Sequence, residues 1–117
     1  GHKKLLHMKR LISMAILCLI VLSASAEIRY QSINNIKGTN IVLIDKNAPS
    51  SVEVTDAVLS NNGEIYPAKQ IRCDLEDGVA TYKFKFKRLT VFKDCKVILT
   101  VNGKKVTIDI QREMEHR

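Results

Sequence analysis

Residues 70–87 read QIRCDLEDGVATYKFKFK, and this stretch decides the fold class. Asp77-Gly78 stands between two segments in which apolar and polar residues alternate, the pattern of a β-hairpin with a two-residue turn. Residues whose numbers add to 155 then face each other across the hairpin. This register predicts one buried face and one solvated face. The predicted buried face carries Ile71, Cys73, Leu75, Ala80, Tyr82, Phe84 and Phe86.

A second hairpin is predicted in residues 95–111, CKVILTVNGKKVTIDIQ, with its turn at Asn102-Gly103. Both central positions of a type I′ turn need a positive φ, which Asn and Gly adopt most readily. Paired residues here add to 205, and three apolar pairs then fall on one side of the hairpin, with Ile98 as the main apolar exception on the other side. The inward pairs are Leu99 with Val106, Val97 with Ile108, and Cys95 with Ile110. Two hairpins therefore separate apolar from polar residues independently.

The remaining segments predict further short strands at residues 28–33, 39–46 and 51–59, and a turn at 60–63 that leads into another strand. No segment after residue 26 has a convincing helical period. Seven to eight short strands predict an all-β protein, a small antiparallel β-sandwich of immunoglobulin-like type, with a small β-barrel as the alternative. The chain lacks tryptophan, so this expectation rests on strand count alone.

Residues 8–26, MKRLISMAILCLIVLSASA, have the three parts of a secretory signal peptide. A basic start precedes an apolar run that is too short to span a bilayer, and small residues follow at the cleavage site. A retained membrane anchor, or a lipoprotein modified at Cys18, are weaker readings. We expect residues 1–7 to be upstream residues, 27–111 to form the β-sandwich domain, and 112–117 to be a polar C-terminal tail.

Removal of the signal peptide changes the charge and the cysteine count of the chain. The formal net charge of +7 falls to about +3, because four of the 19 basic residues precede Glu27, whereas all 12 acidic residues, Glu27 included, remain. This balance does not favour nucleic acid as a partner. Cys73 and Cys95 remain, and an even number in an exported domain predicts a disulfide between them. Two buried free thiols are the alternative.

The sequence offers few groups for catalysis or metal binding. His116 is the only histidine after residue 26 and lies in the polar tail, so neither a Ser–His nor a Cys–His nucleophile is expected. Two cysteines and one histidine are too few for a zinc site, and the acidic residues lack the spacing of a calcium loop. We expect no catalytic residues, no cofactor and no metal.

The lysines of residues 81–87, TYKFKFK, have two interpretations. As the solvated side of a strand they protect a sheet from aggregation. As a binding surface they form a cationic face for an anionic partner. Arg72 opposite Lys83 supports the second interpretation, because like charges paired across strands repel. The first interpretation is nevertheless preferred, because any half-buried strand shows this alternation and Asp74 offsets part of the repulsion. The candidate anion-binding residues are Arg72, Lys83, Lys85 and Lys87.

These observations predict an exported, non-enzymatic binding or accessory module of the cell envelope, located in the periplasm, at the cell surface or outside the cell. No transmembrane anchor is expected after signal cleavage. Its partner is expected to be a protein or a polysaccharide that the sequence does not identify. The alternative is a secreted inhibitor or effector that docks its cationic strand face on an anionic partner.

Overall fold

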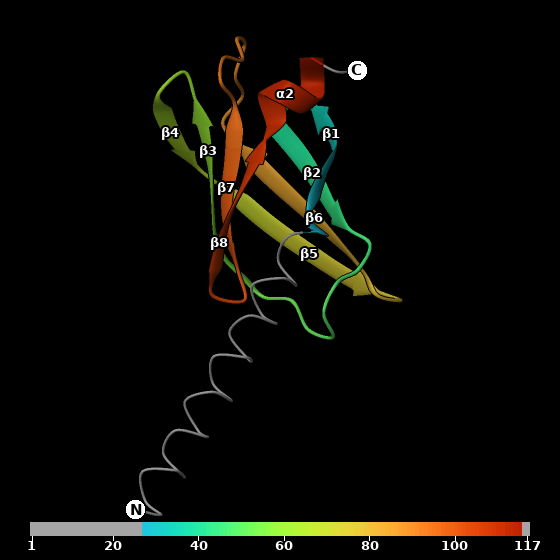
Figure 1. Ribbon diagram of the computed structural model, residues 1–117. Helices are drawn as coiled ribbons and strands as arrows, with labels where there is room; N and C mark the ends of the chain where they lie inside the picture. The colour runs from blue at the N-terminus through green and yellow to red at the C-terminus, as the bar shows by residue number, and fades with distance from the viewer. Residues whose placement is uncertain (1–26, 116–117) are drawn as a thin grey trace, which may run out of the picture.

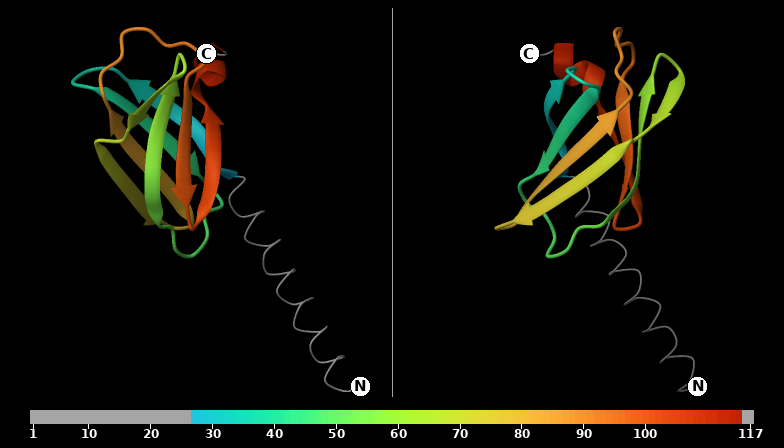
Figure 2. Two further views of the ribbon diagram at one scale, coloured as in Figure 1. Left: turned by 90° about the vertical axis from the view of Figure 1, so that its left-hand side faces the viewer. Right: turned by 180° about the vertical axis from the view of Figure 1, so that it is seen from behind.

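The computed structural model describes residues 27–115, which form two four-stranded antiparallel sheets packed face to face (Figures 1 and 2). The first sheet has the strand order β1-β2-β6-β5, and the second has the order β4-β3-β7-β8. A short helix, α2, follows the last strand. The elements are β1 (Arg29–Asn34), β2 (Thr39–Asp45), β3 (Val54–Asn61), β4 (Glu64–Pro67), β5 (Gln70–Glu76), β6 (Val79–Phe86), β7 (Lys96–Val101), β8 (Lys104–Asp109) and α2 (Ile110–Glu115).

The strand order is that of an immunoglobulin-like sandwich. If the eight strands are lettered A, B, C, C′, D, E, F and G along the chain, the first sheet reads A-B-E-D and the second reads C′-C-F-G. This is the constant-type immunoglobulin arrangement with one added strand, C′, beside strand C. The predicted β-sandwich is confirmed. The alternative of a small barrel does not form, because the two sheets remain separate.

Both predicted hairpin registers are confirmed for the strand residues. Cys73 pairs with Tyr82 across the β5–β6 hairpin, and Leu99 pairs with Val106 across the β7–β8 hairpin. The backbone at Asp77 and Asn102 has φ values of 51° and 49°, as the two-residue turns require.

The core lies between the sheets and contains the inward residues of β6. Tyr82, Phe84 and Phe86 are at most 1% exposed, and neighbouring rings have their centroids 6.2–6.4 Å apart. Lys83, between two of these rings in the sequence, is exposed. The predicted alternation is therefore correct for the buried rings and for Lys83, whereas Lys85, expected in water, is half-buried on the outer face.

The predicted inward face fails at β5, the edge strand of its sheet. Ile71 and Leu75 share a face with the buried residues of β6 but remain 38% and 39% exposed. Alternation along a strand predicts which face a side chain occupies, whereas its burial also depends on whether the opposite sheet extends that far. At β5 the opposite sheet does not cover the face completely.

The end of the described chain differs from the predicted polar tail. Residues 110–115 form α2, and Ile110 and Met114 on this helix pack on the core. Asp109 caps the helix, because its Oδ1 accepts a hydrogen bond of 3.0 Å from the Arg112 backbone N–H. The predicted strand pair of Cys95 with Ile110 is replaced by a bond from the Gln111 N–H to the Cys95 carbonyl. Residues 116 and 117 of the predicted tail lie outside the described residues.

Residues 87–95 connect β6 in the first sheet to β7 in the second, and buried polar side chains hold both ends of this connection. Thr39 Oγ1 accepts a hydrogen bond from the Leu89 N–H at 3.0 Å. On the other sheet, the Asn61 amide donates to the Val91 carbonyl and accepts from the Lys93 N–H, each at 2.9 Å. The connection therefore closes one end of the sandwich, next to the β1–β2 turn.

Candidate anion-binding surface

The outer face of the first sheet carries three of the four predicted cationic residues. In the register of the sheet, Lys83 lies between Val42 on β2 and Arg72 on β5, and Lys85 lies between Asn40 and Gln70. Arg72 and Lys83 are thus directly opposite each other, as the sequence predicted. A shallow depression of about 180 Å³ runs over these two rows of side chains.

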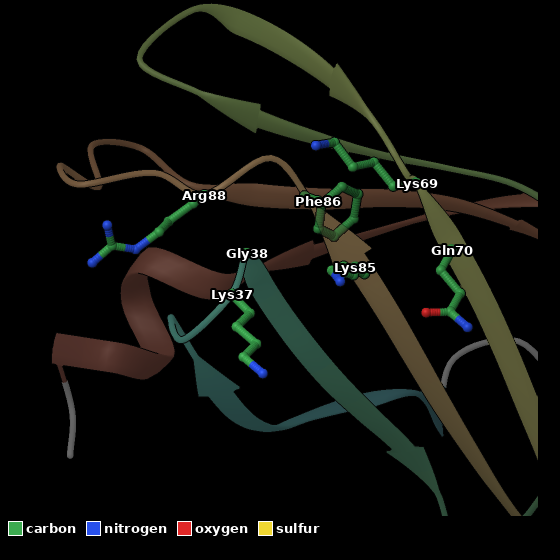
Figure 3. Close-up of a pocket in the computed structure, with 7 residues that line it drawn as sticks. All are labelled: Lys37, Gly38, Lys69, Gln70, Lys85, Phe86 and Arg88. Carbon is green, nitrogen blue, oxygen red and sulfur yellow. The ribbon is translucent and has the colours of Figure 1, made fainter.

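A larger depression of about 550 Å³ adjoins the first and shares Gln70 and Lys85 with it. Figure 3 shows that its side chains come from three further segments: the β1–β2 turn, the β4–β5 connection and the chain after β6. Its lining contains four cationic residues and no acidic residue. The lining residues are Lys37, Gly38, Lys69, Gln70, Lys85, Phe86 and Arg88.

The basic residues of both depressions form a cationic cluster: Lys37, Lys69, Arg72, Lys83, Lys85 and Arg88. Within residues 27–115, none of them forms an ion pair with an acidic side chain. The cluster therefore gathers positive charge on one end of one sheet face, where an anion gains attraction from several groups at once.

Two hydrogen bonds to backbone carbonyls hold the parts of the cluster together. The Lys69 N–H donates to the Lys85 carbonyl at 2.7 Å, which fixes the β4–β5 connection beside β6. Arg88 Nε donates to the Asn35 carbonyl at 3.1 Å, which ties the chain after β6 to the β1–β2 turn. The second of these bonds joins residues that are 53 positions apart in the sequence.

The β1–β2 turn is shaped so that Lys85 can lie against it. Lys37 and Gly38 both have positive φ, 55° and 115°. The Lys85 side chain is half-buried, and its Cε lies 3.1 Å from the position that a Gly38 Cβ would occupy. Asn40 Nδ2 bonds the Ile36 and Gly38 carbonyls at 3.3 Å and so holds the turn from the outer face.

Sequence reasoning found half of this cluster. Arg72, Lys83 and Lys85 are in it, whereas Lys87 is exposed just after β6 and lines neither depression. Lys37, Lys69 and Arg88 were missed. The sequence contains only weak evidence for these three positions. Lys37 precedes a turn glycine, whereas Lys69 and Arg88 lie in connections whose positions depend on how the two sheets pack.

The disulfide predicted between the two cysteines is not formed in this structure. Cys73 is half-buried on β5 and Cys95 is buried just before β7, and both are free thiols. Burial raises the pKa of Cys95 to about 11, with a smaller contribution from Asp109. Burial also raises the pKa of Cys73. These shifts disfavour the reactive thiolate of both residues.

No cluster of three or more His, Cys, Asp or Glu side chains that could hold a metal occurs within residues 27–115. Tyr82, whose pKa is raised to about 12 mainly by burial, lies in the core. In the same range, no helix is long and apolar enough to cross a membrane.

Fold and surface together define an immunoglobulin-like β-sandwich with a cationic cluster on one sheet. The chain belongs to the family described as Domain of unknown function (DUF8177), whose match covers residues 29–112 and thus all eight strands. Comparison with curated proteins finds no match, and neither does comparison with solved structures. The predicted signal peptide, residues 8–26, lies outside the described residues.

Proposed function

We propose that the protein is an exported, non-enzymatic binding module of the cell envelope that uses the cationic cluster to bind an acidic polysaccharide. The observation that carries this proposal is the convergence of Lys37, Lys69, Lys85 and Arg88 around one open depression without an acidic neighbour in the lining. Export is supported by the residue pattern of positions 8–26.

The layout of the cluster suits an extended polyanion. Lys83 and Lys85 are two residues apart on β6, so their side chains leave the same face about 7 Å apart along the strand. Lys69, just before β5, and Lys37, just before β2, lie on either side of this row. A polymer with repeated carboxylate or sulfate groups can contact several of these amines together, whereas a small anion meets only one or two.

Retention on immobilised heparin, a sulfated polysaccharide, tests the proposal. Retention should fall steeply between low and moderate salt, because surface charges are screened over a Debye length of about 8 Å at physiological ionic strength. Replacing Lys37 and Lys85 by alanine should shift elution to lower salt. The matched control replaces Lys96 and Lys105 by alanine. These residues are exposed on β7 and β8 in the other sheet, so the control loses the same two positive charges and should elute close to the parent.

Equal shifts in the cluster variant and the control would show that net charge alone causes retention, and would refute the proposed site. The second candidate function, an inhibitor or effector that docks on an anionic surface, is favoured by the Arg72–Lys83 pair on the adjoining outer face. That candidate would be favoured if the protein bound vesicles of anionic phospholipid but was not retained on heparin, and if Lys83→Ala abolished the vesicle binding.

A further inference from the structure

Strand β5 has one edge that pairs with no other described strand. β5 is the last strand of the sheet β1-β2-β6-β5, and it forms the outer edge of that sheet in the right-hand view of Figure 2. No strand within residues 27–115 pairs with this edge. An open edge offers a row of N–H and C=O groups to another strand.

The β5–β6 hairpin determines which residues offer those groups. Residues that flank a two-residue turn form a hydrogen-bonded pair, and such pairs alternate along the hairpin. Glu76 pairs with Val79 next to the turn, so Asp74 and Arg72 also direct their backbone groups toward β6. Ile71, Cys73 and Leu75 therefore direct theirs to the free edge.

Side chains at the same three positions form an incompletely covered apolar row. Ile71 and Leu75 are 38% and 39% exposed, and Cys73 between them is half-buried. Their neighbours across the hairpin, by contrast, are fully buried: Ala80 is 0% and Phe84 is 1% exposed. The row is thus apolar surface that lies beside an open hydrogen-bonding edge.

We propose that β5 pairs with β5 of a second copy of this chain, antiparallel and centred on Cys73. Cys73 is the midpoint of the seven-residue strand, so this register overlaps the whole strand. It places Ile71 opposite Leu75 of the second copy on the inner face. On the outer face it places Arg72 opposite Asp74 of the second copy.

Charge complementarity selects this partner and this register. Each dimer has two Arg72–Asp74 pairs, because the two-fold axis repeats every contact. Opposite charges directly across strands are favourable, and here they also offset the repulsion between Arg72 and Lys83 within one chain. A register centred on Arg72 or on Asp74 would instead place two like charges opposite each other.

The pairing joins the two first sheets into one continuous sheet of eight strands. The two-fold axis is perpendicular to the sheet, so the outer faces of both copies lie on the same side. The two cationic clusters consequently face the same way. The pairing shares Arg72 with the cationic cluster, but it does not use the four cations around the larger depression, which carry the polysaccharide proposal.

A charge exchange tests the pairing directly, with sedimentation equilibrium as the measurement. The parent protein should show a concentration-dependent dimer. Arg72→Asp should raise the dimer dissociation constant about tenfold or more, because two attractive pairs become repulsive. Asp74→Arg should do the same. The double variant, Arg72→Asp with Asp74→Arg, should restore dimerisation. Lys105→Asp, outside the edge, is the control and should leave the dimer unchanged.

A short bifunctional thiol crosslinker provides a second readout. It should join Cys73 to Cys73 in the parent and in the double variant, and yield little crosslink in either single variant. A protein that is monomeric at every concentration would overturn the inference. So would a dimer that all three variants form equally well, or a crosslink that connects Cys95 instead of Cys73.

Discussion

Lys85 packs directly against Gly38. A Cβ at Gly38 would lie 3.1 Å from the Lys85 Cε and 3.1 Å from the Phe86 carbonyl oxygen, closer than side chains normally approach. The backbone φ of Gly38 is +115°, a value that residues with a side chain rarely adopt. This contact joins the β1–β2 turn to β6 at the cationic cluster.

Gly38→Ala should lower the free energy of unfolding by about 1–3 kcal/mol, through backbone strain and the displacement of Lys85. Urea denaturation measures the loss, and heparin retention should fall with it. Gly63→Ala is the control, because Gly63 also has a positive φ but no atom lies within 4 Å of its added Cβ. An equal loss in both variants would mean that the Lys85 contact contributes nothing.

The two faces of β6 should respond very differently to truncation. Phe84→Ala removes a ring that is 1% exposed and should cost about 3–5 kcal/mol of unfolding free energy. Lys83→Ala, one residue away on the solvated face, should change it by less than about 0.5 kcal/mol. Chemical denaturation of both variants compares them. Similar losses would contradict the assignment of the faces.

Thiol labelling should distinguish the two cysteines. In the folded protein without reductant, Cys73 should react slowly and Cys95 only after unfolding, since Cys95 is 0% exposed. Both pKa values are raised, so the thiolate fraction is small at pH 8 and the Cys73 rate should increase about tenfold per pH unit up to at least pH 9. Recovery of no labelled thiol in denaturant would instead support the disulfide predicted from the sequence.

Export should leave a defined N-terminus. If residues 8–26 are a signal peptide, mass spectrometry of protein recovered outside the cytoplasm should find a chain that begins at Glu27. Replacing Ala26 with a large residue should block this cleavage, because the peptidase requires a small residue there. An intact apolar run in the recovered protein would contradict the cleaved form.

The two hairpins were predictable because their information is local. Alternating residues on either side of Asp77-Gly78 determine the strand faces and the register together, and the same holds around Asn102-Gly103. Asp109 is also a local feature of the sequence, because its side chain caps the helix that begins at Ile110. The alternation of apolar and polar residues does not reveal this helix.

The cationic cluster was only half predictable because its information is not local. Lys83 and Lys85 belong to one strand, and Arg72 follows from the hairpin register. Lys37 and Arg88 join them through a turn and a connection whose positions depend on contacts about 50 residues apart. No pattern within a short window carries such information.

The strands, the alternation of their side chains between two faces, and the β-sandwich class were all predictable from the amino-acid sequence. These depend on backbone sterics and on the alternation of neighbouring residues. The partial exposure of Ile71 and Leu75 and the free thiols of Cys73 and Cys95 follow from the packing of the two sheets. The same packing places Lys37, Lys69 and Arg88 around one depression with Lys85. Burial and proximity depend on where one sheet ends over the other, and that extent is a property of the assembled sandwich.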